Sequence, residues 1–305
     1  MLGPLSPASH HPEAGRGTLA AVACFTVWGL IAVYWKQLGH VPALELIAHR
    51  AVWSLVFLIG ILAWQGRLGA VTAALRDRRA LAYNAATGAL LMLNWLAFIW
   101  AVNHGHVLES SLGYFLVPLS NVATGYLILH ERPRRLQWAA IAFATAGVLL
   151  LLVRAGRLPW VALTIVITWG GYSLIRKKSP MGALDGLAVE TLLFSPLAAG
   201  YLLWLAFQGA GALGHVGARD HVLVLSAGWI TAIPLVWFAY AALRIRLTTL
   251  GLLQYIAPSL QFLLGWLVYR EPFDSAQFQA FALIWCGLLI YSADSFWSQR
   301  RTLFA

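Results

Sequence analysis

Charged residues are scarce in this sequence. Asp, Glu, Lys and Arg together make up 10% of its 305 residues, whereas 60% are hydrophobic and the mean hydropathy is +0.74. A soluble domain needs more charge than this to cover its surface. The shortage excludes a soluble globular protein, and the short segments between apolar runs exclude a large enzymatic head outside the membrane. The composition predicts a polytopic membrane protein.

Several catalytic and ligand-binding motifs are also missing. The two cysteines, Cys24 and Cys286, are isolated within apolar runs, which favours packing residues over a redox or metal site. No GxxxxGK[ST] loop is present, so ATP does not drive the protein directly, and no GxSxG elbow offers a serine nucleophile. His104 and His106 lack the i, i+4 spacing of a helical metal pair. We therefore expect no metal and no cofactor.

Ten apolar runs are each long enough to cross a bilayer as a helix. The sequence therefore predicts an all-α integral membrane protein with ten transmembrane helices. The predicted spans are 18–38, 42–64, 80–102, 108–129, 136–153, 158–175, 184–207, 222–243, 248–269 and 276–296. Residues 1–17 lack the layout of a targeting peptide, so we expect a flexible N-terminal tail there and a cytoplasmic C-terminal tail at 297–305.

The net charge of +10 follows the predicted loops. With the N-terminus inside, the inner segments carry 15 of the 21 Lys and Arg residues and the outer segments carry five. Arg176, Lys177 and Lys178 are counted in one of the inner loops. This bias is the one that the positive-inside rule describes. It predicts that both termini are cytoplasmic, and it accounts for the basic balance without a nucleic-acid partner.

The second half of the chain repeats the first at an offset of 140 residues. The recurring residues are Gly88, Phe98, Pro118, Gly125, Glu131, Gln137 and Gly147, which return as Gly228, Phe238, Pro258, Gly265, Glu271, Gln277 and Gly287. Trp28 corresponds to Trp169 at an offset of 141, and Glu45 to Glu190 at 145. Because five helices per half is an odd number, the second half must enter the membrane in the opposite direction. The prediction is two inverted repeats, 18–153 and 158–296, as in transporters whose site lies between repeats.

Helices four and nine carry matching interruptions. Pro118 and Pro258 lie mid-span, where each removes an amide donor and frees the carbonyl four residues earlier. The freed carbonyls belong to Tyr114 and Gln254. Asn121 and Gln261 follow each proline by three residues and share its helical face. Two interpretations stay open for this face, namely contact with a solute and a helix crossing that the amide bonds across.

Helix two holds the polar cluster Glu45, His49 and Arg50. Glu45 and His49 are four residues apart and share a face, whereas Arg50 points about 100° away from His49. An unpaired ion at a helix centre costs about 2.5 to 3.5 kcal/mol on insertion scales, so partners are expected. The cluster predicts a proton relay, a ligand for a charged substrate, or an ion pair that fixes packing. Glu109, at the outer start of helix four, is expected to be an exposed acid stabilised by the helix dipole.

Aromatic residues are spread through the spans. Helix three offers Asn94, Trp95 and Phe98, and its counterpart offers Trp237. Trp28 and Trp169, each followed by glycine, occupy corresponding places in helices one and six. Rings away from an interfacial belt suit a cavity for apolar or aromatic solutes, although core packing explains any single ring equally well.

Several of these runs resemble one protein family. The runs NWLAFIWAVN (94–103), LESSLGYFLVPLSN (108–121) and GLLQYIAPSLQFLLG (251–265), with the HERP and REP turns, resemble the RarD branch of the EamA proteins, in the drug/metabolite transporter superfamily. The stretch PALELIAHRAVWS (42–54) is similar to the second helix of that branch. The resemblance implies an inner-membrane permease in which helices one to four and six to nine surround a central cavity. It also implies a role for Arg50, whose equivalent after Glu190 is missing, so we expect only one repeat to use this charge.

Together these features predict a secondary transporter of small organic metabolites or drug-like solutes in the bacterial inner membrane. It would work by alternating access, with proton coupling through Glu45, His49 and Arg50 left open. The alternatives are a membrane-embedded enzyme that uses Glu45, His49 and Glu109, and a partner protein that does not transport. The expected partners are a solute and the lipid bilayer, with protons and a homodimer left open. The predicted cavity residues are Trp28, Asn94, Trp95, Phe98, Tyr114, Pro118, Asn121, Trp169, Trp237, Gln254, Tyr255, Pro258 and Gln261.

Overall fold

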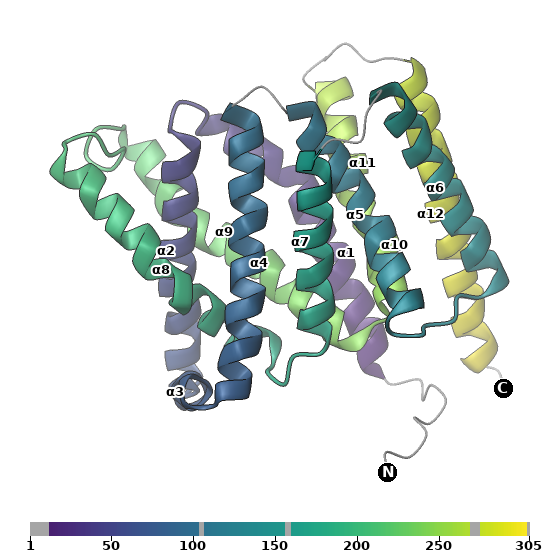
Figure 1. Cartoon of the computed structure of the whole chain (residues 1–305), viewed down its shortest axis with the longest axis horizontal. Coiled ribbons are helices and arrows are strands. Elements are labelled where there is room, and N and C mark those ends of the chain that lie inside the picture. The colour runs from purple at the N-terminus through teal and green to yellow at the C-terminus, as the bar shows by residue number, and fades with distance from the viewer. Residues whose placement is uncertain (1–11, 104–106, 156–159, 269–274, 304–305) are drawn as a thin grey trace.

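The computed structural model of the protein describes residues 12–103, 107–155, 160–268 and 275–303, and every regular element in these ranges is helical (Figure 1). Long helices dominate, with short helical segments at 68–76 and between 247 and 268. The elements are α1 (Pro12–Gln37), α2 (Ala43–Trp64), α3 (Leu68–Arg76), α4 (Arg78–Asn103), α5 (Val107–Leu127), α6 (Arg135–Ala155), α7 (Trp160–Lys177), α8 (Ala183–Phe207), α9 (Ala218–Arg244), α10 (Leu247–Gln254), α11 (Ile256–Leu263), the π-helical turn η1 (Leu264–Val268) and α12 (Ser275–Leu303).

Seven helical stretches in the described residues are long and apolar enough to cross a membrane. They are Glu13–Gln37, Ala43–Trp64, Arg78–Phe98, Arg135–Val153, Ala183–Phe207, Ala218–Arg244 and Leu247–Val268. The prediction of an all-helical membrane protein is therefore confirmed in its coarse form. Helices α5, α7 and α12 occupy the other three predicted spans, but length and hydropathy do not mark them as crossings. His104 and His106 lie outside the described residues.

Two stretches expected to be irregular are helical. The predicted flexible tail 1–17 is wrong for its last residues, because α1 begins at Pro12. Proline suits a first helical turn, and Glu13 in that turn faces the positive end of the helix dipole and pairs with Arg244 at 3.4 Å. The segment 65–79, left between the second and third predicted spans, contains α3. Val71 and Ala74 are buried there, so one face of this short helix packs against the bundle.

The ninth predicted span is not one continuous helix. It divides into α10, α11 and η1, and the first break falls at Tyr255. Pro258 cannot donate to the carbonyl of Gln254, which lies next to the break. Pro118, at the matching place in the first half, is accommodated inside the unbroken helix α5. The two halves therefore respond differently to the same residue.

Helix contacts are paired between the two halves. At the sequence offsets given above, α1 corresponds to α7, α4 to α9, and α5 to the run α10–α11. The contact of α1 with α9 therefore has its counterpart in the contact of α4 with α7, and that of α1 with α11 in the contact of α5 with α7. The helix pairs α2 with α8, α5 with α10 and α6 with α12 each join corresponding elements. Figure 1 shows α6 and α12 side by side at one edge of the bundle. Exchanging one half for the other leaves this set of contacts unchanged.

Glycines make these contacts close. A methyl group on Gly147 would come within 2.6 Å of the Ala280 carbonyl oxygen, and one on Gly287 within 2.7 Å of the Ala140 carbonyl oxygen. Gly147 and Gly287 are 140 residues apart, and so are Ala140 and Ala280. Helices α6 and α12 therefore make the same glycine–alanine contact twice. Small residues at such crossings let helix backbones approach in a bilayer, where burial of apolar surface drives little association.

One end of the bundle is fastened by polar contacts. This end, called the α1 end because α1 begins there, also holds the last residue of α12 (Figure 1). The Glu131 carboxylate accepts the N–H groups of Leu247 at 2.8 Å and Thr248 at 2.9 Å, at the start of α10. Arg67 binds Asp185 at 2.5 Å, which ties the α2–α3 link to the start of α8. A carboxylate at a helix N-terminus satisfies free amides and favours the helix dipole.

We predict that Gly147→Ala destabilises the protein by about 1–3 kcal/mol, because the new methyl group overpacks the α6–α12 contact. Gly287→Ala should cost a similar amount, since it stands in the reciprocal position. Gly60→Ala is the matched control, because nothing lies within 4 Å of the methyl group that it adds to α2. Thermal unfolding of the purified variants in detergent measures the difference. Equal stability of Gly147→Ala and Gly60→Ala would contradict the tight crossing.

Candidate functional site

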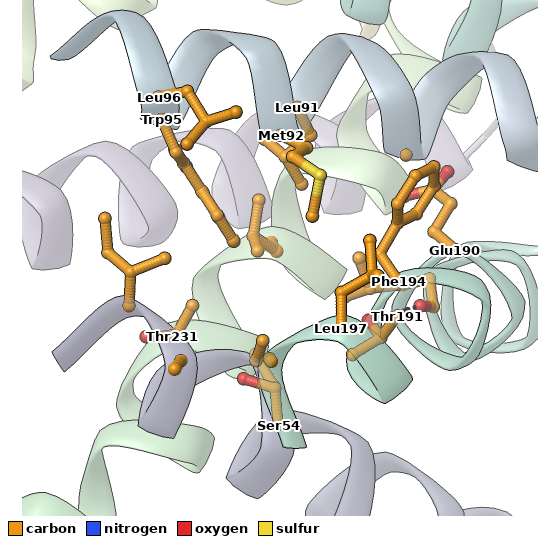
Figure 2. A pocket seen from close by; sticks show the side chains of 18 of the residues that line it. Ser54, Leu91, Met92, Trp95, Leu96, Glu190, Thr191, Phe194, Leu197 and Thr231 are labelled. Carbon is orange, nitrogen blue, oxygen red and sulfur yellow. Dashed lines mark hydrogen bonds between the residues drawn. The ribbon is translucent and has the colours of Figure 1, made fainter. Parts of the chain in front are cut away.

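A cavity of about 190 Å³ lies between α2, α4, α8 and α9. Its walls are mainly apolar, and the few polar side chains include Ser54, Thr231 and Glu190 (Figure 2). Figure 2 shows Trp95 and Thr231 toward one side of the cavity and Glu190 toward the other. The helices that line it come from both halves of the sequence. An apolar pocket with a few polar groups is the usual form of a small-molecule site.

Arg50 on α2 stands beside this cavity. Its Nε donates to the Thr231 hydroxyl at 3.1 Å. Its guanidinium carbon lies 4.9 Å from the ring centroid of Trp35 and 4.9 Å from that of Trp95. Cation–π contacts of this kind hold a guanidinium that has left water. Thr231 and Trp95 line the cavity and contact Arg50, so they connect the charge to the cavity.

A second arginine is buried deeper, in the other half. Arg176 on α7 has no exposed surface and binds Glu190 on α8 at 2.9 Å, while Glu190 is 2% exposed. The other end of the Arg176 fork donates to the carbonyl of Ala183 at 3.0 Å, and Thr87 donates to Glu190 at 2.6 Å. Arg176 lies on α7 and is not the counterpart of Arg50, so the expectation that only one repeat uses the helix-two arginine stays a prediction. A count of Lys and Arg along the chain cannot reveal that the last turn of α7 faces inward.

Two amide side chains join helices in the interior. Asn94 donates to Thr168 at 3.0 Å and accepts from the Tyr114 hydroxyl at 3.2 Å, which links α4, α7 and α5. Asn121 is fully buried and donates to the Gln254 side chain at 2.9 Å. Both amides lie in the predicted cavity set, and both make the interhelical bonds of the packing interpretation.

The paired tryptophans pack against each other. The ring centroids of Trp28 and Trp169 are 5.4 Å apart, in an edge-to-face arrangement. Phe238 joins both rings, at 5.8 Å from Trp28 and 5.4 Å from Trp169. Aromatic pairs favour such tilted geometries. This cluster forms the packed centre of the bundle and does not line the 190 Å³ cavity.

The remaining predicted site residues are dispersed. Pro118 is buried and Pro258 half-buried, Phe98 lies 6.0 Å from Tyr114 by ring centroids, and Tyr255 is fully buried. Trp237 packs at the edge of the core, and Gln261 is exposed and donates to the Trp28 carbonyl at 3.0 Å. Among the described residues that line the 190 Å³ cavity, Trp95 is the one that belongs to the predicted cavity set. Its walls Thr231, Ser54 and Phe194 lacked any signal in the sequence, whereas Glu190 was visible through its match to Glu45.

Glu45 and His49 lie apart from Arg50. Both are 2% exposed, with Glu45 Oε1 3.6 Å from His49 Nε2, and they border a separate cavity of about 210 Å³ against α8. Glu45 also accepts the N–H of Ala212, in the link between α8 and α9. Neither His49 nitrogen has a hydrogen-bond partner. The predicted cluster therefore divides into a carboxylate–imidazole pair on one face of α2 and a cation on another.

Metal and catalytic groupings can be assessed only over the described residues. There, no three His, Cys, Asp or Glu side chains gather as a metal site would require. Cys24 is buried and Cys286 exposed, and both are free thiols. The Glu109 side chain lies outside the described residues, so its predicted place at the start of helix four remains a prediction.

Comparisons with known proteins agree on one family. Residues 15–153 match the EamA-like transporter family. The chain is 43% identical to an uncharacterized transporter of Vibrio cholerae, covering 92% of this chain and 93% of the relative. It is 41% identical to the protein RarD of Streptomyces exfoliatus, covering 95% and 92%, and 38% identical to the protein RarD of Escherichia coli, covering 94% and 97%. One crystal structure, 21% identical, has the same fold, with a TM-score of 0.69 over 92% of this chain and 97% of that one.

We predict that Glu190→Ala destabilises the protein by about 3–5 kcal/mol, because it leaves the buried Arg176 without its counterion. The double variant Arg176→Met/Glu190→Leu should recover most of that loss, since two apolar side chains replace the ion pair. Thermal unfolding and the yield of folded protein measure both. A double variant that is less stable than Glu190→Ala would contradict this reason. It would show that the ion pair itself holds α7 to α8, and that the loss in Glu190→Ala does not come from an unpaired arginine.

Proposed function

The chain belongs to the EamA-like transporter family, with RarD proteins among its relatives, and from this membership we propose that it is a secondary transporter of small organic solutes. It is a multi-pass protein of the bacterial inner membrane. The names of the curated relatives support transport rather than catalysis. The solute crosses through the interior of the bundle, driven by an ion gradient or by its own gradient.

The proposed architecture is ten membrane-crossing helices in two inverted repeats of five. The crossings are α1, α2, α4, α5 and α6, then α7, α8, α9, the run α10–η1, and α12. The reciprocal contacts of Gly147 and Gly287 support a twofold axis between the halves. An even number of crossings puts both termini on one side, which agrees with α1 beginning and α12 ending at the α1 end (Figure 1). The positive-inside count assigns that end to the cytoplasm.

Alternating access is supported by one difference between equivalent residues. Asn121 and Gln261 correspond at the offset of 140, yet Asn121 is fully buried against Gln254 and Gln261 is exposed. Asn121 lies toward the α1 end of its helix and Gln261 toward the opposite end. A symmetric pair that is closed at one end and open at the other is the arrangement expected of a rocking transporter in one of its two states.

The closed end is the proposed cytoplasmic one. The Glu131 contact with the start of α10 and the Arg67–Asp185 ion pair both span the two halves there. Opening this end requires these bonds to break, and water can then satisfy the freed groups. The structure therefore corresponds to a proposed outward-facing state.

Proton coupling is proposed at Glu45 and His49. The two side chains are adjacent, buried and next to a cavity, and imidazole exchanges protons near neutral pH. The bond of Glu45 to the amide of Ala212 joins this pair to the α8–α9 link. Protonation of Glu45 weakens its hold on that amide and so joins proton binding to movement of the second half.

We predict that a cysteine at Gln261 reacts with a membrane-impermeant thiol reagent at least tenfold faster from the outside than a cysteine at Asn121. The reason is that the Gln261 position is exposed and the Asn121 position closed. The background for both is Cys24→Ala/Cys286→Ala. Reaction of the Gln261 cysteine from the cytoplasm alone would overturn the proposed topology and state.

We predict that Glu45→Gln removes the response of solute flux to an imposed pH gradient but keeps solute exchange, because exchange needs no net proton movement. Purified protein in liposomes, screened with a metabolite panel, tests transport and coupling together. Asp77→Asn, an exposed acid in the α3–α4 link, is the control and should respond as the wild type does. A Glu45→Gln protein that remains fully driven by the pH gradient would leave the pair as a packing device. A wild type that moves none of the panel would count against the transport function.

A further inference from the structure

Arg50 lacks an internal counterion. In the described part of the chain no carboxylate oxygen lies within 4 Å of its guanidinium, and its single protein hydrogen bond is the one from Nε to Thr231. The terminal nitrogens are not among the buried atoms that lack a partner, so they reach open space. The fork of the guanidinium therefore has no partner among the described residues, and the Thr231 hydroxyl that its Nε binds lines the 190 Å³ cavity.

The nearby carboxylates are already engaged. Glu190 binds Arg176 and Thr87, and Glu45 binds the amide of Ala212 beside His49. A side-chain rearrangement that gave Arg50 a counterion would strip another buried group of its partner. Because an uncompensated charge in a membrane protein is unfavourable, a missing counterion points to a ligand that supplies it.

The space beside Arg50 defines the rest of that ligand. The cavity that Trp95 and Thr231 line is walled by aliphatic and aromatic side chains such as Leu91, Met92 and Phe194 (Figure 2). Its 190 Å³ is more than ten times the roughly 10–15 Å³ that a cavity needs to hold one water, which admits a compact apolar or aromatic body. The Glu190 carboxylate lies on the side away from Trp95 and Thr231, where it already neutralises Arg176, so a second carboxylate of a ligand would find no cation to pair with there.

We propose that the solutes of this transporter are small organic monocarboxylates, held with the carboxylate on the Arg50 fork and the apolar body in the 190 Å³ cavity. The inference rests on the proposed transport function and adds the substrate class to it. A guanidinium binds a carboxylate through two parallel N–H···O bonds, a geometry that an ammonium group cannot reproduce. The Trp35 and Trp95 rings hold the guanidinium carbon at 4.9 Å each, and the terminal nitrogens bind no described residue.

Binding is tested on the purified full chain in a neutral detergent, by the shift in unfolding temperature on titration of three probes. Phenylacetate has the proposed form, 2-phenylacetamide is its neutral counterpart, and phthalate carries two carboxylates. A ligand that binds the folded state raises the unfolding temperature in proportion to its affinity. We expect a shift with phenylacetate and at least tenfold weaker binding of the other two. A wild type that binds none of the three, or binds the amide as well as the carboxylate, overturns the proposal.

Variants separate recognition from packing. Arg50→Met and Arg50→Lys should each weaken phenylacetate binding at least tenfold, whereas Arg78→Met, an exposed arginine at the start of α4, should bind as the wild type does. Phenylacetate binding by Arg50→Met at wild-type strength overturns the proposal. If Arg50→Met fails to fold, Ala51→Leu decides, because it fills the cavity and keeps the charge. Unchanged binding by Ala51→Leu then overturns the proposal.

Transport and substrate class fail in different ways. Binding in detergent requires no alternation between states, so phenylacetate that binds but never enters liposomes contradicts transport and leaves the carboxylate site standing. Liposomes that exchange neutral solutes while phenylacetate neither binds nor competes contradict the carboxylate site and leave transport standing.

Discussion

A bilayer offers no water to a charge or to a free backbone amide, and the arrangement of this protein follows from that constraint. Arg176 and Glu190 enter the interior together, with Thr87 adding a further hydrogen bond. The free amides at the start of α10 are satisfied by Glu131. Arg50 is the departure from this rule, because rings and one hydroxyl surround it where a carboxylate would be expected. A buried cation without a counterion is retained most readily where a bound ligand supplies the negative charge.

The same constraint separates two kinds of contact between the halves. Glycine crossings such as those at Gly147 and Gly287 lie at the edge of the bundle, where the helix backbones approach each other directly. The Glu131 contact and the Arg67–Asp185 pair lie at the end of the bundle, where water can replace either partner. In the proposed rocking mechanism, rigid crossings beside replaceable polar bonds would let one half tilt against the other without unpacking. The 190 Å³ cavity has walls from both halves, so its opening would change in that proposed movement.

The sequence predicts the helices and reveals the repeat at an offset of 140 residues, because apolar length and a constant offset are properties of the chain alone. It fails where a property depends on which neighbour a side chain meets. The sequence places Arg176 in a basic loop, yet its side chain is buried. The sequence also predicts Trp28 and Trp169 as cavity walls, yet the two rings pack on each other. Glu45 and Arg50 are close in sequence and face different partners. Thr231 and Phe194, which line the cavity, carry no charge or spacing that could have marked them.

The doubled contact of α6 with α12 bears on how such a chain arises. An interface in which Gly147 meets Ala280 and Gly287 meets Ala140 is isologous, the kind that two identical subunits share around a twofold axis. A single ancestral half could assemble with an inverted copy of itself through this surface before any linker joined them. If the proposed repeats arose by fusion of two such copies, Arg50 on α2 and Arg176 on α7 are places where the copies have diverged. The glycine contact is a place where the two halves have remained the same.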